Sequence, residues 1–222
     1  MTHGIIFDID GTLVDSVDLH ARAWQDALAH FGYDVPFDKV REQIGKGGDQ
    51  LMPVFVPRDE LERRSDEMER WRGEHYKARY LPEVRAFPKV RELFERILQA
   101  GDRIALASSA KADELEIYKR LARIEDLVER ETSADDVERS KPHPDIFLAA
   151  IATLDGIDPD RLVVVGDSPY DPEAAGKAGL RTIGVLCGGF PEDALRRAGC
   201  FAIYRDPEHL LTDYDASPLA CK

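Results

Sequence analysis

The sequence predicts an α/β protein with a doubly wound parallel sheet, into which a second, helical unit is inserted after the first strand. Short continuous apolar segments, amphipathic segments between them, and a long strandless stretch at about residues 17–83 lead to this prediction. Continuous apolar runs are typical of strands that are buried on both faces of a parallel sheet. Their alternation with helices indicates the doubly wound class.

Four apolar segments are the expected strands. They read GIIFDI, RIALASS, LVVVGD and TIGVLC, and none alternates polar with apolar residues. Two helices are expected to lie against this sheet, because each carries apolar residues on one face. These residues are Val90, Leu93, Phe94, Ile97 and Leu98 in one helix, and Phe147, Ala150, Ile151 and Leu154 in the other.

The inserted unit is expected to be helical. Its first segment carries Val17, Ala21, Trp24, Leu28 and Phe31, whose spacings of three and four are typical of one helix face. A long, highly charged segment follows and ends at a proline, which predicts a partly solvated helix. We therefore expect a core made of residues 1–16 and 84–222, and a helical insert made of residues 17–83.

Composition narrows the possible functions. A chain of 222 residues with 43% hydrophobic content can bury a substantial core. The 30 Lys and Arg against 43 Asp and Glu give a formal charge of −13, which disfavours nucleic acid and anionic membranes as partners. We find neither a signal peptide nor an apolar run long enough to span a membrane, and we expect a cytoplasmic protein. Cys187, Cys200 and Cys221 lack metal-ligand spacing, which argues against a disulfide framework or a zinc site.

Candidate catalytic residues follow the expected strands. In parallel sheets of this kind, ligands bind beyond the carboxyl ends of the strands. The polar residues at these ends are Asp8, Asp10, Ser108, Ser109, Asp167 and Asp171, and a loop adds Lys141. A lone pair of aspartates would fit a helix cap or a turn equally well. Several carboxylates, several hydroxyls and one ammonium at a common edge of the predicted sheet instead indicate a catalytic site.

These residue types suit phosphoryl transfer with Mg²⁺, which prefers one or two carboxylates together with waters and a phosphate oxygen. With Asp8 and Asp167 on the metal, Lys141 and the Ser108 hydroxyl can hold a phosphoryl group. Asp8 can then attack phosphorus to give an aspartyl-phosphate. Asp10 is placed to protonate the leaving oxygen and afterwards to take a proton from the attacking water.

Taken together, "DIDGTLVDS" at 8–16, Ser108, Lys141 before a proline, and "GDSPYD" at 166–171 resemble the four motifs of the haloacid dehalogenase superfamily of phosphotransferases. The resemblance implies a Rossmann-like core, and the insert falls where subclass I members carry a helical cap. It implies that Asp8 is the nucleophile, and that Asp10 is the general acid/base and a magnesium ligand through its backbone carbonyl.

For the other motifs, the resemblance implies that Asp167 is a magnesium ligand and Asp171 a supporting acid. Ser108, the neighbouring Ser109 and Lys141 are the expected phosphate-binding residues. The implied cofactor is Mg²⁺, and the expected partner is a small-molecule phosphate ester.

Departures from the motifs separate the branches of the superfamily. Asp10 argues against the dehalogenases, which generally lack this aspartate, and against phosphonate hydrolases, which usually carry Ala there. "DSVDLHARAW" and "IALASS" are similar to β-phosphoglucomutases, whereas Gly11-Thr12 and "GDSPYD" resemble phosphatases. We favour a phosphatase that acts on a small phosphorylated metabolite such as phosphoglycolate or a sugar phosphate, with a β-phosphoglucomutase-type phosphotransferase as the alternative.

Two residues of the insert are candidate substrate contacts. Lys46 stands among three glycines, in a loop that could bring a cation over the catalytic face, or it is a solvated lysine at the end of a helix. His20 lies beside the apolar stripe of the first helix, where a packed histidine is the competing interpretation.

Two other protein classes remain as alternatives. In a phospho-accepting receiver module the first aspartate would be a signalling site, but Asp10 and the insert count against this class. A catalytically idle relative could use its cap to bind a partner, but the presence of Asp8, Asp10, Lys141 and Asp167 counts against it. We expect a monomer or a homodimer.

Overall fold

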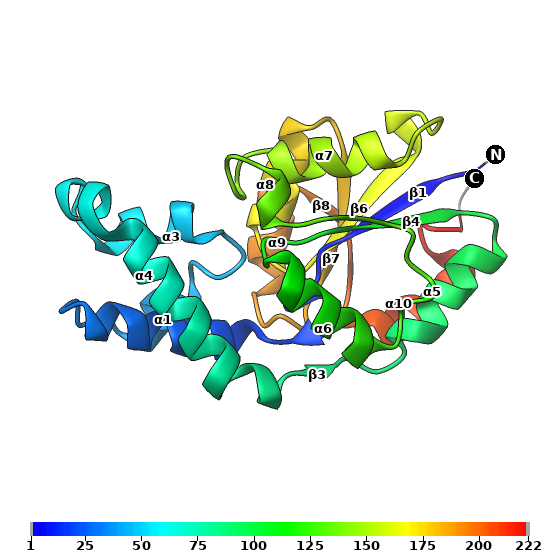
Figure 1. Cartoon of the computed structure of the whole chain (residues 1–222). Helices are drawn as coiled ribbons and strands as arrows, with labels where there is room; N and C mark the ends of the chain where they lie inside the picture. Colours follow the sequence, from blue (N-terminus) through cyan, green and yellow to red (C-terminus); the bar gives the residue numbers. More distant parts are fainter. Residues whose placement is uncertain (1, 221–222) are drawn as a thin grey trace.

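The computed structural model describes residues 2–220 and has a six-stranded parallel sheet at its centre (Figure 1). The strands are β1 (Gly4–Phe7), β4 (Arg103–Ala107), β5 (Arg130–Thr132), β6 (Leu162–Gly166), β7 (Arg181–Val185) and β8 (Cys200–Tyr204). Across the sheet they lie in the order β5-β4-β1-β6-β7-β8. The predicted α/β class with a doubly wound parallel sheet is confirmed.

Each of the four apolar segments named in the sequence forms a strand, and β5 and β8 extend the sheet at its edges. Two of the three residues of β5 are exposed, and four of the five residues of β8 are only half-buried. The sequence did not reveal these strands, because an edge strand lacks the continuous apolar run of a buried one.

Apolar side chains point alternately to the two faces of the sheet. In β1, Ile5 and Phe7 pack on one face, and Ile6 packs on the other. Helices cover both faces (Figure 1). The first face packs against α5 (Val90–Gln99), α6 (Ala112–Ala122) and α10 (Pro207–Thr212), and the second against α7 (Asp145–Thr153) and α8 (Tyr170–Lys177). A further helix, α9 (Glu192–Ala198), precedes β8.

Four helices lie beyond the carboxyl ends of the strands, and we call them the cap helices (Figure 1). They are α1 (Val17–His30), α2 (Phe37–Arg41), α3 (Gly48–Phe55) and α4 (Arg58–Arg79). They share an apolar cluster of their own, in which Trp24 and Leu28 of α1 pack with Leu51 of α3 and Met68 of α4. The long charged segment of the sequence forms α4, as predicted.

The two segments that connect the cap helices to the core run side by side as an antiparallel ribbon of β2 (Val14–Asp15) and β3 (Arg85–Ala86). Tyr76 and Tyr80, near the end of α4, belong to the apolar cluster of the core instead of that of the cap helices. The exact division at residues 16 and 84 stays a prediction, and it falls next to this ribbon.

The sheet places its central strands where a ligand site is expected. β1 lies between β4 and β6, where the winding of the chain reverses, and ligands of open α/β sheets bind beyond the strand ends at such a point. Asp8, Ser108 and Asp167 directly follow these three strands.

Composition had raised two further expectations. Across residues 2–220, no helix combines the length and the apolar character that crossing a membrane requires. Cys187 is half-buried and Cys200 is buried, and both are free thiols, while Cys221 lies outside the described residues.

Candidate active site

The loop after β1 carries Asp8 and Asp10 and turns at Gly11. Gly11 has a φ of +81°, in the left-handed region that favours glycine. A Cβ atom here would lie 2.3 Å from Oδ2 of Asp167, so a larger residue would collide with the end of β6. The next residue, Thr12, places its hydroxyl oxygen 3.3 Å from Oδ2 of Asp8 and 3.3 Å from Oδ1 of Asp167. The turn thus joins the ends of β1 and β6.

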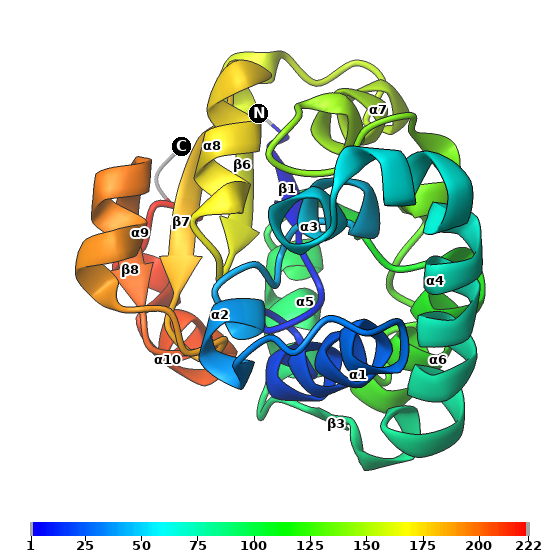
Figure 2. The ribbon, with the colours of Figure 1, turned by 90° about the vertical axis from the view of Figure 1, so that its left-hand side faces the viewer.

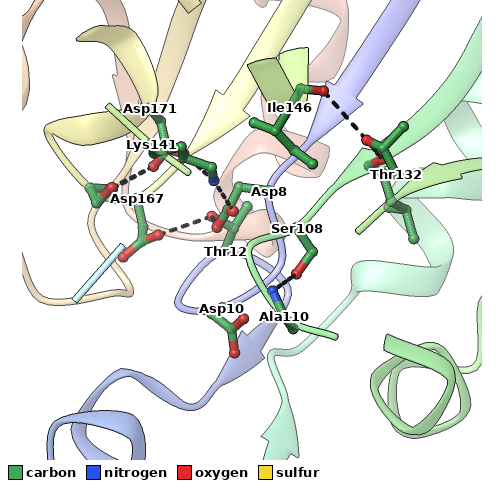
Figure 3. A network of polar contacts seen from close by, with 12 residues as sticks. Asp8, Asp10, Thr12, Ser108, Ala110, Thr132, Lys141, Ile146, Asp167 and Asp171 are labelled. Atoms are coloured by element: carbon green, nitrogen blue, oxygen red, sulfur yellow. Dashed lines mark hydrogen bonds and ion pairs between the residues drawn. The ribbon is translucent and has the colours of Figure 1, made fainter. Parts of the chain in front are cut away.

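Three buried aspartates gather at these strand ends, and we call Asp8, Asp167 and Asp171 the carboxylate cluster (Figure 3). One oxygen of each lies within 4.8 Å of the others. The Lys141 ammonium donates to Asp8 Oδ1 and, at 2.8 Å, to Asp171 Oδ1. Asp171 Oδ2 also accepts hydrogen bonds from the backbone amide and the hydroxyl of Ser168, at 3.0 and 2.7 Å. Asp171 is therefore the member held most firmly by protein groups.

The surroundings of the cluster disfavour the ionised acids. Burial raises the pKa of Asp8 to about 7, although the charge of Lys141 opposes this shift. Burial, together with the negative charges of Asp8 and Asp171, raises the pKa of Asp167 well above its usual value. Three carboxylates share one ammonium, so the cluster retains excess negative charge when all three are ionised.

This donor set fits a hard divalent cation. Mg²⁺ prefers carboxylate oxygens, and a bound cation offsets the repulsion among buried carboxylates. The prediction had named Asp8, Asp10 and Asp167 as ligands, with Asp10 acting through its backbone carbonyl. The side chains that converge are those of Asp8, Asp167 and Asp171, whereas the Asp10 carboxylate turns to other partners.

Asp10 lies in a second set of contacts, which we call the Asp10 network. Its Oδ1 atom accepts a hydrogen bond from the Ser16 hydroxyl at 2.6 Å and lies 2.9 Å from Nε2 of His20. On the other side of the ring, Nδ1 of His20 lies 2.6 Å from Nη2 of Arg72. Burial favours the neutral acid, but His20, Ser16 and Arg72 outweigh it and hold the pKa of Asp10 below its usual value. Asp10 is therefore kept as a carboxylate.

A cavity of about 320 Å³ lies between the core and the cap helices. Five of the predicted site residues line it, namely Asp8, Asp10, His20, Lys46 and Ser109. The other four, Ser108, Lys141, Asp167 and Asp171, are buried in the protein around the end of β1. The cavity thus opens onto the carboxylate cluster through Asp8.

The expected phosphate-binding residues differ in their present contacts. The Ser108 hydroxyl accepts a hydrogen bond from the backbone amide of Ala110 at 3.0 Å (Figure 3). Ser109 lines the cavity. Lys141 is engaged by two carboxylates of the cluster. Phosphate binding by these three residues stays a prediction.

The loop that carries Lys46 rests on the core. Its ammonium donates to Gln43 at 2.6 Å and lies 4.7 Å from the centre of the Tyr170 ring, and burial lowers the pKa of Lys46. A Cβ atom at Gly45 would lie 2.5 Å from the Ser168 hydroxyl, and one at Gly47 would lie 2.0 Å from the Ser140 hydroxyl. These glycines thus allow the loop to touch the core, and substrate contacts of Lys46 and His20 stay predictions.

Arg72, Tyr76 and Tyr118 are site residues that the sequence interpretation missed. Arg72 belongs to a helix that was predicted to be partly solvated, and it lines the cavity and contacts His20. A signal was present, because Met68, Arg72 and Tyr76 recur every four residues and mark one face of α4. Tyr118 belongs to an ordinary amphipathic helix, and nothing in its local sequence distinguishes it.

Comparisons with known proteins agree with this fold. A phosphorylated carbohydrates phosphatase of Thermotoga maritima is 29% identical over 209 residues, which cover 93% of this chain and 95% of the relative. The crystal structure of a hydrolase from Pseudomonas syringae has a TM-score of 0.88 and 28% identity, covering 97% of this chain and 99% of that one. The structure of CbbY from Rhodobacter sphaeroides in complex with xylulose-(1,5)bisphosphate has a TM-score of 0.73 and 26% identity, with coverage of 95% and 96%.

The family model described as haloacid dehalogenase-like hydrolase matches residues 5–185. This range contains all four motifs and the cap helices. The predicted enzyme class, a hydrolase, is confirmed, and the relative named as a phosphatase agrees with the narrower class, phosphoric monoester hydrolase. The chain belongs to the haloacid dehalogenase-like hydrolase family.

Proposed function

We propose that this chain is a Mg²⁺-dependent phosphatase that hydrolyses a small phosphorylated metabolite through an aspartyl-phosphate on Asp8. One observation carries the proposal: the carboxylate cluster, with its single ammonium from Lys141, lies at the end of β1 beside a cavity. Buried acids in such excess are costly unless they serve a charged ligand.

Asp8 and Asp167 would hold Mg²⁺, with the backbone carbonyl of Asp10 as a further ligand. Asp171 is held by Lys141 and Ser168, so it would support the site and orient the ammonium. When bound, Mg²⁺ supplies positive charge to the phosphoryl oxygens and to the cluster.

The chain's own residues account for both chemical steps. An oxygen of Asp8 bonds to phosphorus while the bond from phosphorus to the alcohol oxygen breaks. The alcohol oxygen takes a proton from Asp10, which is a carboxylate in the unliganded protein and must first take up this proton from solvent. Asp10 is then a carboxylate, the form that Ser16 and His20 stabilise. In this form it takes a proton from the water that attacks the phosphorus, which releases phosphate and restores Asp8.

The cavity favours a small substrate. Its volume of about 320 Å³ is at the small end of ligand pockets, and the loop at Gly45 to Gly48 closes it from the cap side. We propose a phosphoglycolate-like compound or a sugar phosphate, supported by the relative named for phosphorylated carbohydrates. Cap contact with the core would exclude bulk water during the first step.

The proposal is tested by measuring phosphate release from a panel of small phosphate esters, with and without Mg²⁺. We expect Mg²⁺-dependent release from the wild-type protein and its loss in Asp8→Asn. Asp193→Asn is the matched control, because Asp193 is exposed and pairs only with Arg197 on α9 among the ion pairs of the described residues. Release that persists in Asp8→Asn would contradict the proposal.

The same assay separates the alternatives. Interconversion of hexose phosphates primed by a bisphosphate, without net phosphate release, would favour the β-phosphoglucomutase-type phosphotransferase. Absence of both activities would favour the idle, partner-binding relative. The cytoplasmic location and the state of monomer or homodimer stay predictions.

A further inference from the structure

A buried chain of hydrogen bonds links the core helix α6 to Asp10 through two of the cap helices. The Tyr118 hydroxyl of α6 lies 2.6 Å from the Tyr76 hydroxyl of α4 and 3.1 Å from Nε2 of His20 on α1. The same His20 nitrogen lies 2.9 Å from Oδ1 of Asp10. Tyr118, Tyr76 and His20 are all buried, at 1%, 0% and 5% exposure. Side chains from α1, α4 and α6 thus meet at the imidazole of His20.

Arg72 decides where the hydrogen on this imidazole sits. A guanidinium can only donate hydrogen bonds, so Nδ1 of His20, 2.6 Å from Arg72 Nη2, must accept one. The ring hydrogen is therefore on Nε2, between Asp10 Oδ1 and the Tyr118 hydroxyl. Burial raises the pKa of both Tyr76 and Tyr118, so each enters the chain as a neutral hydroxyl.

The ring of His20 is also held from its face. It stacks on Tyr76 with the ring centres 4.0 Å apart and the planes inclined by 14°. The Arg72 guanidinium lies over the rings of Trp24 and Tyr76, at 5.1 and 5.2 Å. The orientation of the imidazole, and with it the hydrogen bond to Asp10, thus depends on how α4 packs against α1 and α6.

The helices α4 and α6 are neighbours (Figure 2), and a second side-chain contact joins them. The Lys77 ammonium, next to Tyr76, donates to Asp113 of α6 at 2.5 Å and lies 4.0 Å from the buried carboxylate of Glu114. Asp113 and Lys77 are partly solvated, so this ion pair is worth little by itself. The buried Tyr118 hydroxyl is therefore the contact through which α6, a helix of the core, reaches His20 of the cap helices.

We propose that Tyr118 is a positioning residue, whose hydroxyl orients His20 and thereby Asp10 only when the cap helices lie against α6. The inference rests on the proposed function, in which Asp10 delivers a proton to the leaving oxygen. Proton transfer needs donor and acceptor within hydrogen-bond reach, so a displaced carboxylate loses rate. The arrangement ties this proton transfer to the seated position of the cap helices.

The test compares two substrates in Tyr118→Phe. This change removes one hydroxyl and keeps the aromatic ring. An alkyl phosphate needs a proton on its leaving oxygen, whereas p-nitrophenyl phosphate releases a stabilised phenolate. We expect kcat/KM for the alkyl phosphate to fall about tenfold, a part of the 10²–10⁴-fold that a general acid contributes, and kcat/KM for p-nitrophenyl phosphate to stay within about twofold.

Tyr214→Phe is the matched control. Tyr214 is another buried tyrosine of the same apolar cluster, and its hydroxyl has no hydrogen-bond partner among the described residues. It should leave both substrates unchanged. Equal losses for both substrates in Tyr118→Phe would indicate a merely structural tyrosine and overturn the proposal, as would no loss. If the wild-type protein released no phosphate from either substrate, this result would instead contradict the proposed function.

Discussion

Asp8 and Asp10 are two residues apart in the chain, yet they lie in opposite surroundings. Asp8 is in the carboxylate cluster, where burial raises its pKa to about 7, and Asp10 is in the Asp10 network, where His20, Ser16 and Arg72 outweigh burial and lower its pKa. The carboxylate cluster lies at the strand ends of the sheet. The Asp10 network is formed by helices from both the core and the cap.

This difference separates two tasks. The carboxylate cluster is built by core elements alone, and its donor set fits a cation whatever the position of the cap helices. The Asp10 network exists only while α1, α4 and α6 are in contact, because His20, Arg72 and Tyr118 come from different helices. On the proposed function, metal binding and phosphate binding would therefore belong to the core, and proton transfer to the assembled core and cap.

The largest expected effect is on proton transfer. In Asp10→Asn, turnover of an alkyl phosphate should fall about 10²–10⁴-fold, because the amide cannot shuttle a proton. The fold should remain intact, since the amide can still accept hydrogen bonds from Ser16 and His20 through its oxygen. Initial rates and circular dichroism would check this. Unchanged turnover would contradict the acid/base role of Asp10, and with it the division of tasks between Asp8 and Asp10.

The next effect concerns the cation. Mg²⁺ at about 100 times its dissociation constant should raise the free energy of unfolding by about 2.7 kcal/mol, because it binds only the folded cluster. Thermal or chemical unfolding with and without Mg²⁺ measures this. Asp8→Asn should lose most of the gain, whereas Asp193→Asn should keep it. An equal gain in all three proteins would mean that the ion binds elsewhere.

The pH dependence of the Mg²⁺-free protein extends this prediction. The folded protein raises the pKa of Asp8 from 3.8 to about 7, so between these pH values the folded state keeps a proton that the unfolded state releases. The free energy of unfolding should therefore fall as pH rises from about 4 to 7, and the slope should be smaller in Asp8→Asn. A free energy that rises over this range would show that the carboxylate is favoured in the folded state.

A third prediction disturbs the contact between cap and core without touching either aspartate. In Gly47→Ala, the new Cβ atom would lie 2.0 Å from the Ser140 hydroxyl, so the loop must move away from the core. Overpacking of this kind costs about 1–3 kcal/mol, and we expect KM to rise about tenfold. Steady-state kinetics would check this, and an unchanged KM would show that the loop does not close over the substrate.

The smallest effect concerns the stability of α4. Gly73 lies within α4, and a Cβ atom there would meet nothing within 4 Å. Gly73→Ala should therefore stabilise the protein by about 0.5–1 kcal/mol through helix propensity. Chemical unfolding measures the gain. A loss of stability would mean that α4 must bend or move at this point.

The two regions also differ in how far the sequence predicted them. The carboxylate cluster was predictable, because continuous apolar strands end in Asp8 and Asp167 and parallel strands bring their carboxyl ends to one edge. The close approach of Asp171 to Asp8 and Asp167 was not, although Asp171 was expected at this edge as a supporting acid. It depends on Lys141 and Ser168, which join Asp171 to the cluster from separate loops.

The Asp10 network could be predicted only in part. His20 was named, but as a substrate contact, because its partners Arg72 and Tyr118 lie far away in the sequence and meet it only when α4 packs against α1 and α6. Gly45 and Gly47 suggested flexibility, whereas their lack of a side chain allows close contact with the core. Such tertiary contacts leave no periodic pattern in the chain.

The most direct test of the account is to trap the covalent intermediate. The protein would be mixed with Mg²⁺ and a phosphate ester labelled in its phosphoryl group, quenched in acid during turnover, and digested for peptide mass analysis. We expect the label on the peptide that contains Asp8, and none in Asp8→Asn. Turnover without labelled protein, or label on another residue, would contradict the assignment of Asp8 as the nucleophile.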